Sequence, residues 1–357
     1  MSSTSVESLQ STTARPLRRL LYGASGLVLF LLALELVKKG AAGLTPLLQP
    51  LQAAGDLGAL GFGWLMACVV LSGSPVAAVA LGLLAGGTLG PRACLAMIVG
   101  SRLGASFVVL LVGTLDDIRA GRREMRSAYV GAVALVATAV TYLPSLLLAL
   151  HGLDAGWLAS VRIEGRQLAS LVSLAFSPLL RPAAELLHPA ALFAIGVATL
   201  LGAFRVFDGV LPDADSQREA LQSARDRLER PLAMFAAGLA VTAVSMSVSM
   251  SLSILVPLVA KGYVRRERLW PYVLGANITT FDDTLFAAAL VGHADAVRIV
   301  LLLVLSVTLC SAPLVLLTPG RFGAGLDAVA RGFTRSRLAL LGFACLVVAL
   351  PALLLLL

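Results

Sequence analysis

Long apolar stretches alternate with short polar ones along almost the whole chain. A helix needs about 20 mainly apolar residues to cross the hydrocarbon core of a bilayer. Stretches of this kind lie at 20–37, 57–72, 91–113, 128–150, 184–204, 231–250, 268–291, 294–317 and 338–357, with shorter or interrupted ones at 74–88, 168–180 and 251–262. The pattern predicts an all-α polytopic membrane protein with about eight to ten spans and two re-entrant or broken segments.

Two polar segments punctuate this pattern. Residues 1–14 are rich in Ser and Thr and predict a disordered N-terminal tail. The charged segment 205–230 predicts a solvent-exposed linker with a short surface helix. This linker divides the chain into a first membrane half, residues 15–204, and a second membrane half, residues 231–357.

The composition agrees with a membrane environment. Apolar residues make up 58% of the chain and charged residues 13%, whereas a soluble domain carries about a quarter of charged residues. Strand-like alternation is not repeated along the chain, which argues against an outer-membrane barrel. The net charge of +8 comes from cations in short loops, where the positive-inside bias places them, so it does not indicate nucleic-acid binding. Arg15, Arg18 and Arg19 precede the first span and predict that the N-terminus lies on the cytoplasmic side. We expect the protein to lie in the cell membrane.

The sequence offers little enzymatic chemistry. The four cysteines lie far apart, outside any CxxC or Cys/His cluster, and predict neither a metal site nor a disulfide framework. A nucleotide-binding loop of the GxxxxGK[ST] type is missing, as are a nucleophile–base set and paired catalytic carboxylates. We therefore expect a protein that is not an enzyme and has no cofactor, apart from Na⁺ as a coupling ion.

Two segments of the chain align without a gap. Residues 71–110 begin LSGSPVAAVA and residues 246–285 begin MSVSMSLSIL, at an offset of 246 − 71 = 175. Each segment starts with a hydroxyl-rich cluster, continues through an apolar run and a short loop, and then opens a span near a glycine. Identical residues occupy the aligned positions Ser72 and Ser247, Ser74 and Ser249, Gly87 and Gly262, and Gly100 and Gly275. The alignment predicts an internal repeat.

Serines and glycines at membrane depth have a physical consequence. Broken helices leave backbone groups that hydrocarbon cannot satisfy, so such segments line a cavity or pack against protein. Pro75 and Pro257 favour breaks in the two copies. Transporters place substrate at broken helices where inverted repeats meet. The alternative is close helix packing through small residues, without any ligand.

The second copy resembles the sodium/phosphate cotransporter family. The resemblance is carried by SMSVSMSLSILVPLVAKG at 245–262 and ERLWPYVLGANITT at 267–280. The family has two QSSS motifs, each followed by a Gly-Ala-Asn-Ile-Gly-Thr-Thr segment, and residues 23–44 are similar to its first helix. The resemblance implies two inverted-topology repeats and sodium-coupled phosphate transport.

The resemblance implies serine and threonine site residues, and the ionisable residues inside the apolar spans add Arg102, Asp282 and Asp283. Serine hydroxyls and helix-end N–H groups can hold a tetrahedral anion, and a planar guanidinium suits an oxyanion. The expected substrate contacts are Ser72, Gly73, Ser74, Ser247, Ser249, Asn277 and Arg102. The expected cation contacts are Ser251, Thr279, Thr280, Asp282 and Asp283.

The chain departs from the family at these motifs. Leu71 and Met246 stand at the glutamine positions, and Arg102 stands at the asparagine position of the first copy. Ionisable groups inside a span cost several kcal/mol unless they are paired or hydrated, so we expect Arg102 to pair with Asp282 or Asp283. That pair could replace a sodium site, could leave an aspartate to carry Na⁺ or a proton, or could be a permanent salt bridge. In a further alternative, Arg102 is a fixed anion anchor.

These features predict a secondary-active transporter that moves inorganic phosphate or a related oxyanion with sodium by alternating access. Two alternatives stay open: the same scaffold with another substrate or with proton coupling, and a non-transporting membrane subunit. The expected partners are the small anion and the lipid bilayer, with no nucleic acid, and a homo-oligomer is compatible with the sequence.

Overall fold

The computed structural model is helical throughout the part of the chain that it describes. The described residues are 3–41, 54–121, 125–161, 166–208, 219, 221, 230–260 and 263–356. Within these ranges the helices are joined by turns and short connections, and no strand occurs. The prediction of an all-α protein is confirmed for them. Most of the linker predicted at 205–230 lies outside the described residues.

Six helices are long and apolar enough to cross a membrane. They are α1 (Ser3–Ala41, with its apolar part at Leu21–Ala41), α5 (Pro91–Arg119), α6 (Arg126–Asp154), α8 (Pro189–Asp208), α14 (Ala296–Leu317) and α16 (Arg337–Leu354). The chain is therefore a multi-pass membrane protein. The expected eight to ten full spans are too many for the described residues, because several of the expected spans are broken into shorter helices.

The broken spans give pairs of short helices. The first pair is α3 (Gly55–Val70) and α4 (Ser74–Ala85), and the second is α10 (Pro231–Ser245) and α11 (Val248–Ala260). The stretch 268–291, expected to be one span, forms α12 (Trp270–Thr279) and α13 (Asp282–Val291). The remaining helices are α7 (Arg166–Leu186) and α15 (Pro319–Thr334).

The first two breaks have the same backbone geometry. Helix α3 ends at Leu71 with φ of 58°, and α10 ends at Met246 with φ of 48°. Each residue closes its helix by donating its N–H to a carbonyl four residues earlier, in Ala67 and Thr242 respectively. A left-handed conformation costs a non-glycine residue roughly 1–2 kcal/mol. The surrounding packing therefore imposes these two sharp turns.

Helix α3 packs against α5, and α10 packs against α12, with backbones in contact. A Cβ on Gly100 of α5 would overlap the carbonyl oxygen of Leu60 on α3. A Cβ on Gly275 of α12 would likewise overlap the carbonyl oxygen of Phe235 on α10. The numbers of the two glycines differ by 275 − 100 = 175, and those of their partners by 235 − 60 = 175. Only glycine permits so close an approach.

A second pair of contacts repeats in the same register. Gly63 on α3 lies against the carbonyl of Met97, and Gly238 on α10 lies against the carbonyl of Tyr272. Here too the separations are 238 − 63 = 175 and 272 − 97 = 175. The helix pairs α3–α5 and α10–α12 therefore use equivalent positions to pack.

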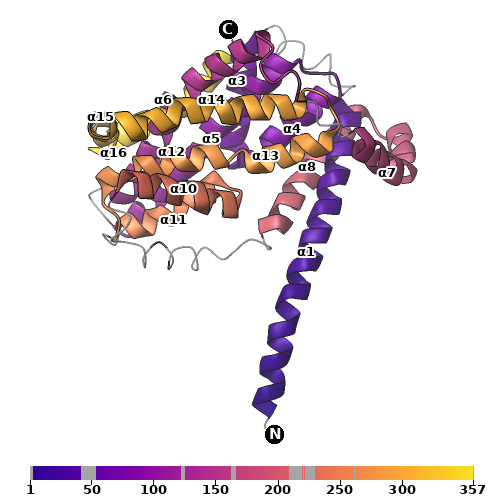
Figure 1. Ribbon diagram of the computed structural model, residues 1–357, viewed down its shortest axis with the longest axis horizontal. Helices are drawn as coiled ribbons and strands as arrows, with labels where there is room; N and C mark the ends of the chain where they lie inside the picture. Colours follow the sequence, from indigo (N-terminus) through magenta and orange to yellow (C-terminus); the bar gives the residue numbers. More distant parts are fainter. Residues whose placement is uncertain are drawn as a thin grey trace.

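The helices surround a core formed by α5 and α6, which pack closely against each other. Helices α1 and α8 lie side by side, and the N-terminal part of α1 projects away from the body (Figure 1). Residues 3–14, expected to be disordered, continue α1 as helix.

Candidate functional site

A cavity of about 600 Å³ lies at the first two helix breaks. Ser72 and Ser74 line it from the α3–α4 break, and Ser247 and Ser249 line it from the α10–α11 break. These four serines, 175 residues apart in pairs (247 − 72 = 175 and 249 − 74 = 175), face one space. The structure thus brings together the two hydroxyl clusters that the sequence identified.

Two helices begin at this cavity. Helix α4 starts at Ser74, with Pro75 in its first turn, and α11 starts at Val248. The first N–H groups of a helix lack partners inside the helix, and together with the helix dipole they favour an anion. At α11, the Ser247 hydroxyl accepts a hydrogen bond of 3.3 Å from the N–H of Met250. Serine hydroxyls and the starts of two helices therefore lie together at this end of the cavity.

A buried ion pair lies beside the serines. The Arg102 side chain is 1% exposed, and its Nη2 donates to Asp283 Oδ1 at 3.0 Å. Nη2 also donates to the Thr284 hydroxyl, while Nη1 donates to Ser74 Oγ at 3.4 Å and Thr280 Oγ1 at 3.3 Å. The predicted pairing of Arg102 is confirmed, and its partner is Asp283. Arg102 on α5 thereby connects the start of α4 to the α12–α13 break.

The hydrogen-bonding capacity of this pair is not filled. Asp283 lines the cavity and is 6% exposed, and its Oδ2 has no hydrogen-bond partner among the described residues. Arg102 Nε is also buried and has no hydrogen-bond acceptor among the described residues. The ring of Phe281 lies over the guanidinium, 5.3 Å from Cζ to the ring centroid, a cation–π arrangement. A buried unpaired acceptor costs roughly 1–3 kcal/mol, so a hydrogen-bond donor or a cation at Asp283 Oδ2 would remove this cost.

Several expected site residues lie in helix contacts instead of at the cavity. Asn277 Nδ2 donates to Thr138 Oγ1 on α6 at 3.1 Å, and the Asn277 carbonyl accepts from the Tyr142 hydroxyl at 2.7 Å. The Thr279 hydroxyl donates to the Leu239 carbonyl at 3.0 Å. Neither Asn277 nor Thr279 lines the cavity. Their polar groups hold α12 against α6 and α10.

Three further expected residues are placed as follows. The Ser251 hydroxyl is buried and bonded to Thr242 at 2.7 Å and Tyr272 at 2.9 Å. Gly73 lies at the α3–α4 break, where a Cβ would come within 2.8 Å of the Ser101 carbonyl oxygen. Glycine at this position lets the break approach α5. Asp282 is half-buried and forms none of the hydrogen bonds described around Arg102.

The cavity also has features that the sequence did not reveal. Phe30 of α1, Phe204 and Phe207 of α8, and Phe286 of α13 form an aromatic wall, the name used below for these four rings. Arg205 on the last turn of α8 lines the cavity as well, is exposed, and has no carboxylate partner within the described part of the chain. Phenylalanines in apolar helices resemble lipid-facing residues in sequence, so no local signal distinguishes them.

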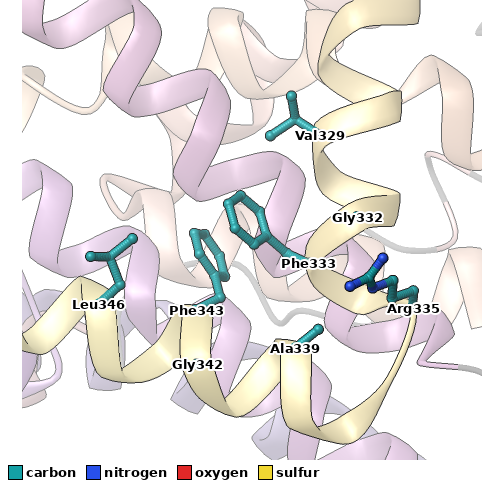
Figure 2. A pocket seen from close by; sticks show the side chains of 8 residues that line it. All are labelled: Val329, Gly332, Phe333, Arg335, Ala339, Gly342, Phe343 and Leu346. Atoms are coloured by element: carbon teal, nitrogen blue, oxygen red, sulfur yellow. The ribbon is translucent and has the colours of Figure 1, made fainter.

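A second cavity, of about 500 Å³, lies between α15 and α16. Figure 2 shows the Phe333 and Phe343 side chains meeting there, with ring centroids 4.1 Å apart and stacked. Arg335 is its single charged lining residue, and the rest of the lining is apolar or glycine (Figure 2). It lacks the clustered hydroxyls and helix starts of the serine-lined cavity.

Comparison of the chain with known protein families, with curated proteins and with solved structures gives no match. The sodium/phosphate cotransporter resemblance therefore stays a prediction based on the motifs. Three or more His, Cys, Asp or Glu side chains do not gather into a metal site anywhere in the described ranges.

Proposed function

We propose that the chain is a secondary-active transporter of the cell membrane that moves inorganic phosphate or a related oxyanion with sodium, by alternating access. The proposal rests mainly on the cavity that is lined by serines from two equivalent helix breaks. Broken helices in a membrane protein pack against protein or line a cavity, and here both breaks contribute hydroxyl groups to one cavity. We also expect that the chain is not an enzyme.

The recurring glycine contacts support the inverted repeat on which alternating access depends. Equivalent backbone contacts at Gly100 and Gly275 favour two copies of one folding unit over chance similarity between apolar segments. Helices α3 and α10 lie on opposite sides of the body, with α5 and α12 between them (Figure 1). In transporters of this type, inverted copies rock around a site at their interface. The cavity between the two serine pairs is where such a site belongs.

The chemistry of the cavity favours an oxyanion. Ser72, Ser74 and Ser247 supply hydroxyl donors, and the starts of α4 and α11 supply N–H groups. The Ser249 hydroxyl lines the cavity as well and donates to the Ala105 carbonyl at 3.2 Å. Donors of this kind bind an anion without a permanently paired charge, so the anion can also leave. Arg205 adds a positive charge at the cavity.

Sodium coupling is supported by the oxygens around Asp283. The carboxylate, Thr280 and Thr284 gather beside the cavity, and Asp283 Oδ2 has no hydrogen-bond partner in the described structure. Hard cations take oxygen ligands. A sodium ion at Asp283 would offset the negative charge of the substrate in the same cavity.

Proton coupling is the second candidate, and the ion pair itself favours it. Arg102 already places a positive charge on Asp283, which leaves less need for Na⁺. If the pair separates as the cavity changes its access, the carboxylate loses its partner and binds a proton more readily. On this alternative, Asp283 carries the coupling proton.

Uptake into proteoliposomes tests the proposal. The purified chain is reconstituted, and uptake of labelled phosphate is measured with a sodium gradient, with a potassium gradient, and with a pH gradient alone. Sulfate and lactate serve as competing anions. We expect sodium-driven phosphate uptake that falls strongly in Ser74→Ala and Ser249→Ala and is retained in Ser311→Ala, a buried serine outside the cavity. Uptake driven by pH alone would select the proton alternative, and no uptake under any gradient would contradict the proposal.

A further inference from the structure

The serine-lined cavity is larger and more apolar than an inorganic anion requires. Its volume of about 600 Å³ lies in the range of roughly 300–1,000 Å³ found for pockets that bind whole organic ligands. A phosphate ion bound at the serines would leave most of this space to water against apolar side chains. Water there is unfavourable because exposed apolar surface costs about 25 cal/mol per Å².

The apolar part of the cavity is formed by side chains that pack against one another. Phe30 is 1% exposed and lies at the centre of the aromatic wall. Its ring centroid is 5.8 Å from that of Phe204, 6.1 Å from that of Phe207 and 6.0 Å from that of Phe286. The wall therefore joins α1, α8 and α13 around one space. Phe286 is 45% exposed and so presents a free ring face.

The two break residues add to the apolar surface. Leu71 and Met246 line the cavity and are 46% and 47% exposed, although both are large and apolar. They occupy the positions where the family resemblance leads one to expect glutamine. An isobutyl group and a thioether supply flexible apolar contacts and offer no hydrogen-bond donor to an oxyanion. They therefore favour a ligand with an apolar group.

We propose, building on the proposed transporter function, that the substrate is an organic oxyanion: a phosphate monoester that carries an aromatic or short alkyl group. Its phosphate lies at the starts of α4 and α11, among the four serines. Its apolar group lies against the aromatic wall, Leu71 and Met246.

The test is uptake of a graded set of phosphates by the full chain in proteoliposomes. The probes are labelled inorganic phosphate, methyl phosphate, butyl phosphate and phenyl phosphate. Each buried methylene contributes about 0.8 kcal/mol, roughly fourfold in affinity. The three further methylenes of butyl phosphate correspond to roughly sixtyfold if they are fully buried. We therefore expect half-saturation for both butyl phosphate and phenyl phosphate at least tenfold below that for methyl phosphate.

A matched pair of variants locates the apolar group. Gly23 of α1 lines the cavity, and a Cβ there meets open space. Gly23→Leu should fill the apolar part and abolish the preference for phenyl phosphate, while leaving methyl phosphate uptake within twofold. Gly202→Leu on α8 is the control, because a Cβ there also meets open space but Gly202 does not line the cavity. It should leave both substrates unchanged.

The other outcomes separate the two proposals. Uptake of inorganic phosphate with no uptake of, or competition by, phenyl phosphate would overturn the organic substrate and leave the transporter function standing. Absence of uptake for every probe would overturn both. Vesicles with and without phosphatidic acid form a further arm. Loss of the phenyl preference only when this lipid is present would assign the aromatic wall to a lipid chain and overturn the proposal.

Discussion

Arg102 on α5 donates a hydrogen bond of 3.0 Å to Asp283 on α13, so one buried ion pair joins the two membrane halves. Both side chains are almost fully enclosed, at 1% and 6% exposure. Removing one member of such a pair leaves a buried charge without a partner, whereas removing both does not. Comparing single and double substitutions of this pair therefore distinguishes its contribution to stability from its contribution to transport.

Substitution of one partner should destabilise the fold much more than substitution of both. We expect Arg102→Met and Asp283→Leu each to lower the free energy of unfolding by about 3–5 kcal/mol, and the double variant to recover most of that loss. Denaturant unfolding in detergent measures this. The control is Arg92→Met, which breaks two exposed pairs, with Asp56 and with Asp154, and should cost under about 2 kcal/mol, since each exposed pair contributes at most about 1 kcal/mol. Equal losses in the single and double variants would rule out a stabilising pair.

The break residues Leu71 and Met246 should tolerate glycine. Their φ values of 58° and 48° suit glycine better than a residue with a Cβ, so Leu71→Gly and Met246→Gly should raise stability or leave it unchanged, by up to about 1 kcal/mol. Val69 and Val244 are matched controls, because each lies two residues earlier in the helix and is exposed. Val69→Gly and Val244→Gly should lower the melting temperature. A loss of stability at Leu71 as large as at Val69 would refute this reading of the break.

The glycine contacts between helix backbones should be intolerant of alanine. Gly100→Ala and Gly275→Ala each place a Cβ against a carbonyl oxygen of the neighbouring helix, and overpacking of this kind costs about 1–3 kcal/mol. Gly202→Ala meets open space and should be neutral or stabilising. Melting temperatures in detergent distinguish them. If the two copies are equivalent, the losses at Gly100 and Gly275 should be similar; a loss at one site alone would argue against equivalent packing.

Arg205 should contribute to anion capture. It lines the cavity and is exposed, so Arg205→Gln should raise the half-saturation for phosphate uptake about fivefold, with a smaller effect at high salt. The maximal rate should change little. Arg181→Gln on α7 removes an exposed charge that does not line the cavity. Equal effects of the two substitutions would assign the change to overall charge instead of a local contact.

The sequence predicted the main features of the fold for physical reasons that act locally. Apolar length fixes which helices can span a bilayer, and the first break lies close to Pro75, as expected. The second break was expected at Pro257, which lies inside α11 instead. That break falls at Met246, within the expected span 231–250. The break between Thr280 and Phe281 was missed, because GANITTFDDT carries no proline or glycine at that point. The segment nevertheless forms two helices, α12 and α13, with a turn between them beside the buried guanidinium of Arg102.

The candidate site was only partly accessible to sequence reasoning. An ionisable residue inside a span demands a partner, and this identified Arg102 with one of two aspartates. Which aspartate pairs depends on rotation about α13, and the structure gives Asp283. Asn277 shows the opposite case: its motif indicated substrate contact, yet its amide bonds to Thr138. The aromatic wall depends on tertiary packing of α1 and α8, which no local pattern encodes.

Accessibility of the serine pairs tests the central claim most directly. Ser72→Cys and Ser247→Cys are made separately in a chain whose native Cys310 and Cys345 are replaced by alanine, with the buried Ser311→Cys as control. Each variant is treated with a membrane-impermeant thiol reagent from one side of the vesicle at a time, with and without phosphate. We expect Ser72→Cys and Ser247→Cys to react from either side and phosphate to slow both reactions, while Ser311→Cys stays unreactive. If neither cysteine reacts from either side, or phosphate changes neither rate, the serine-lined cavity is not a transport site.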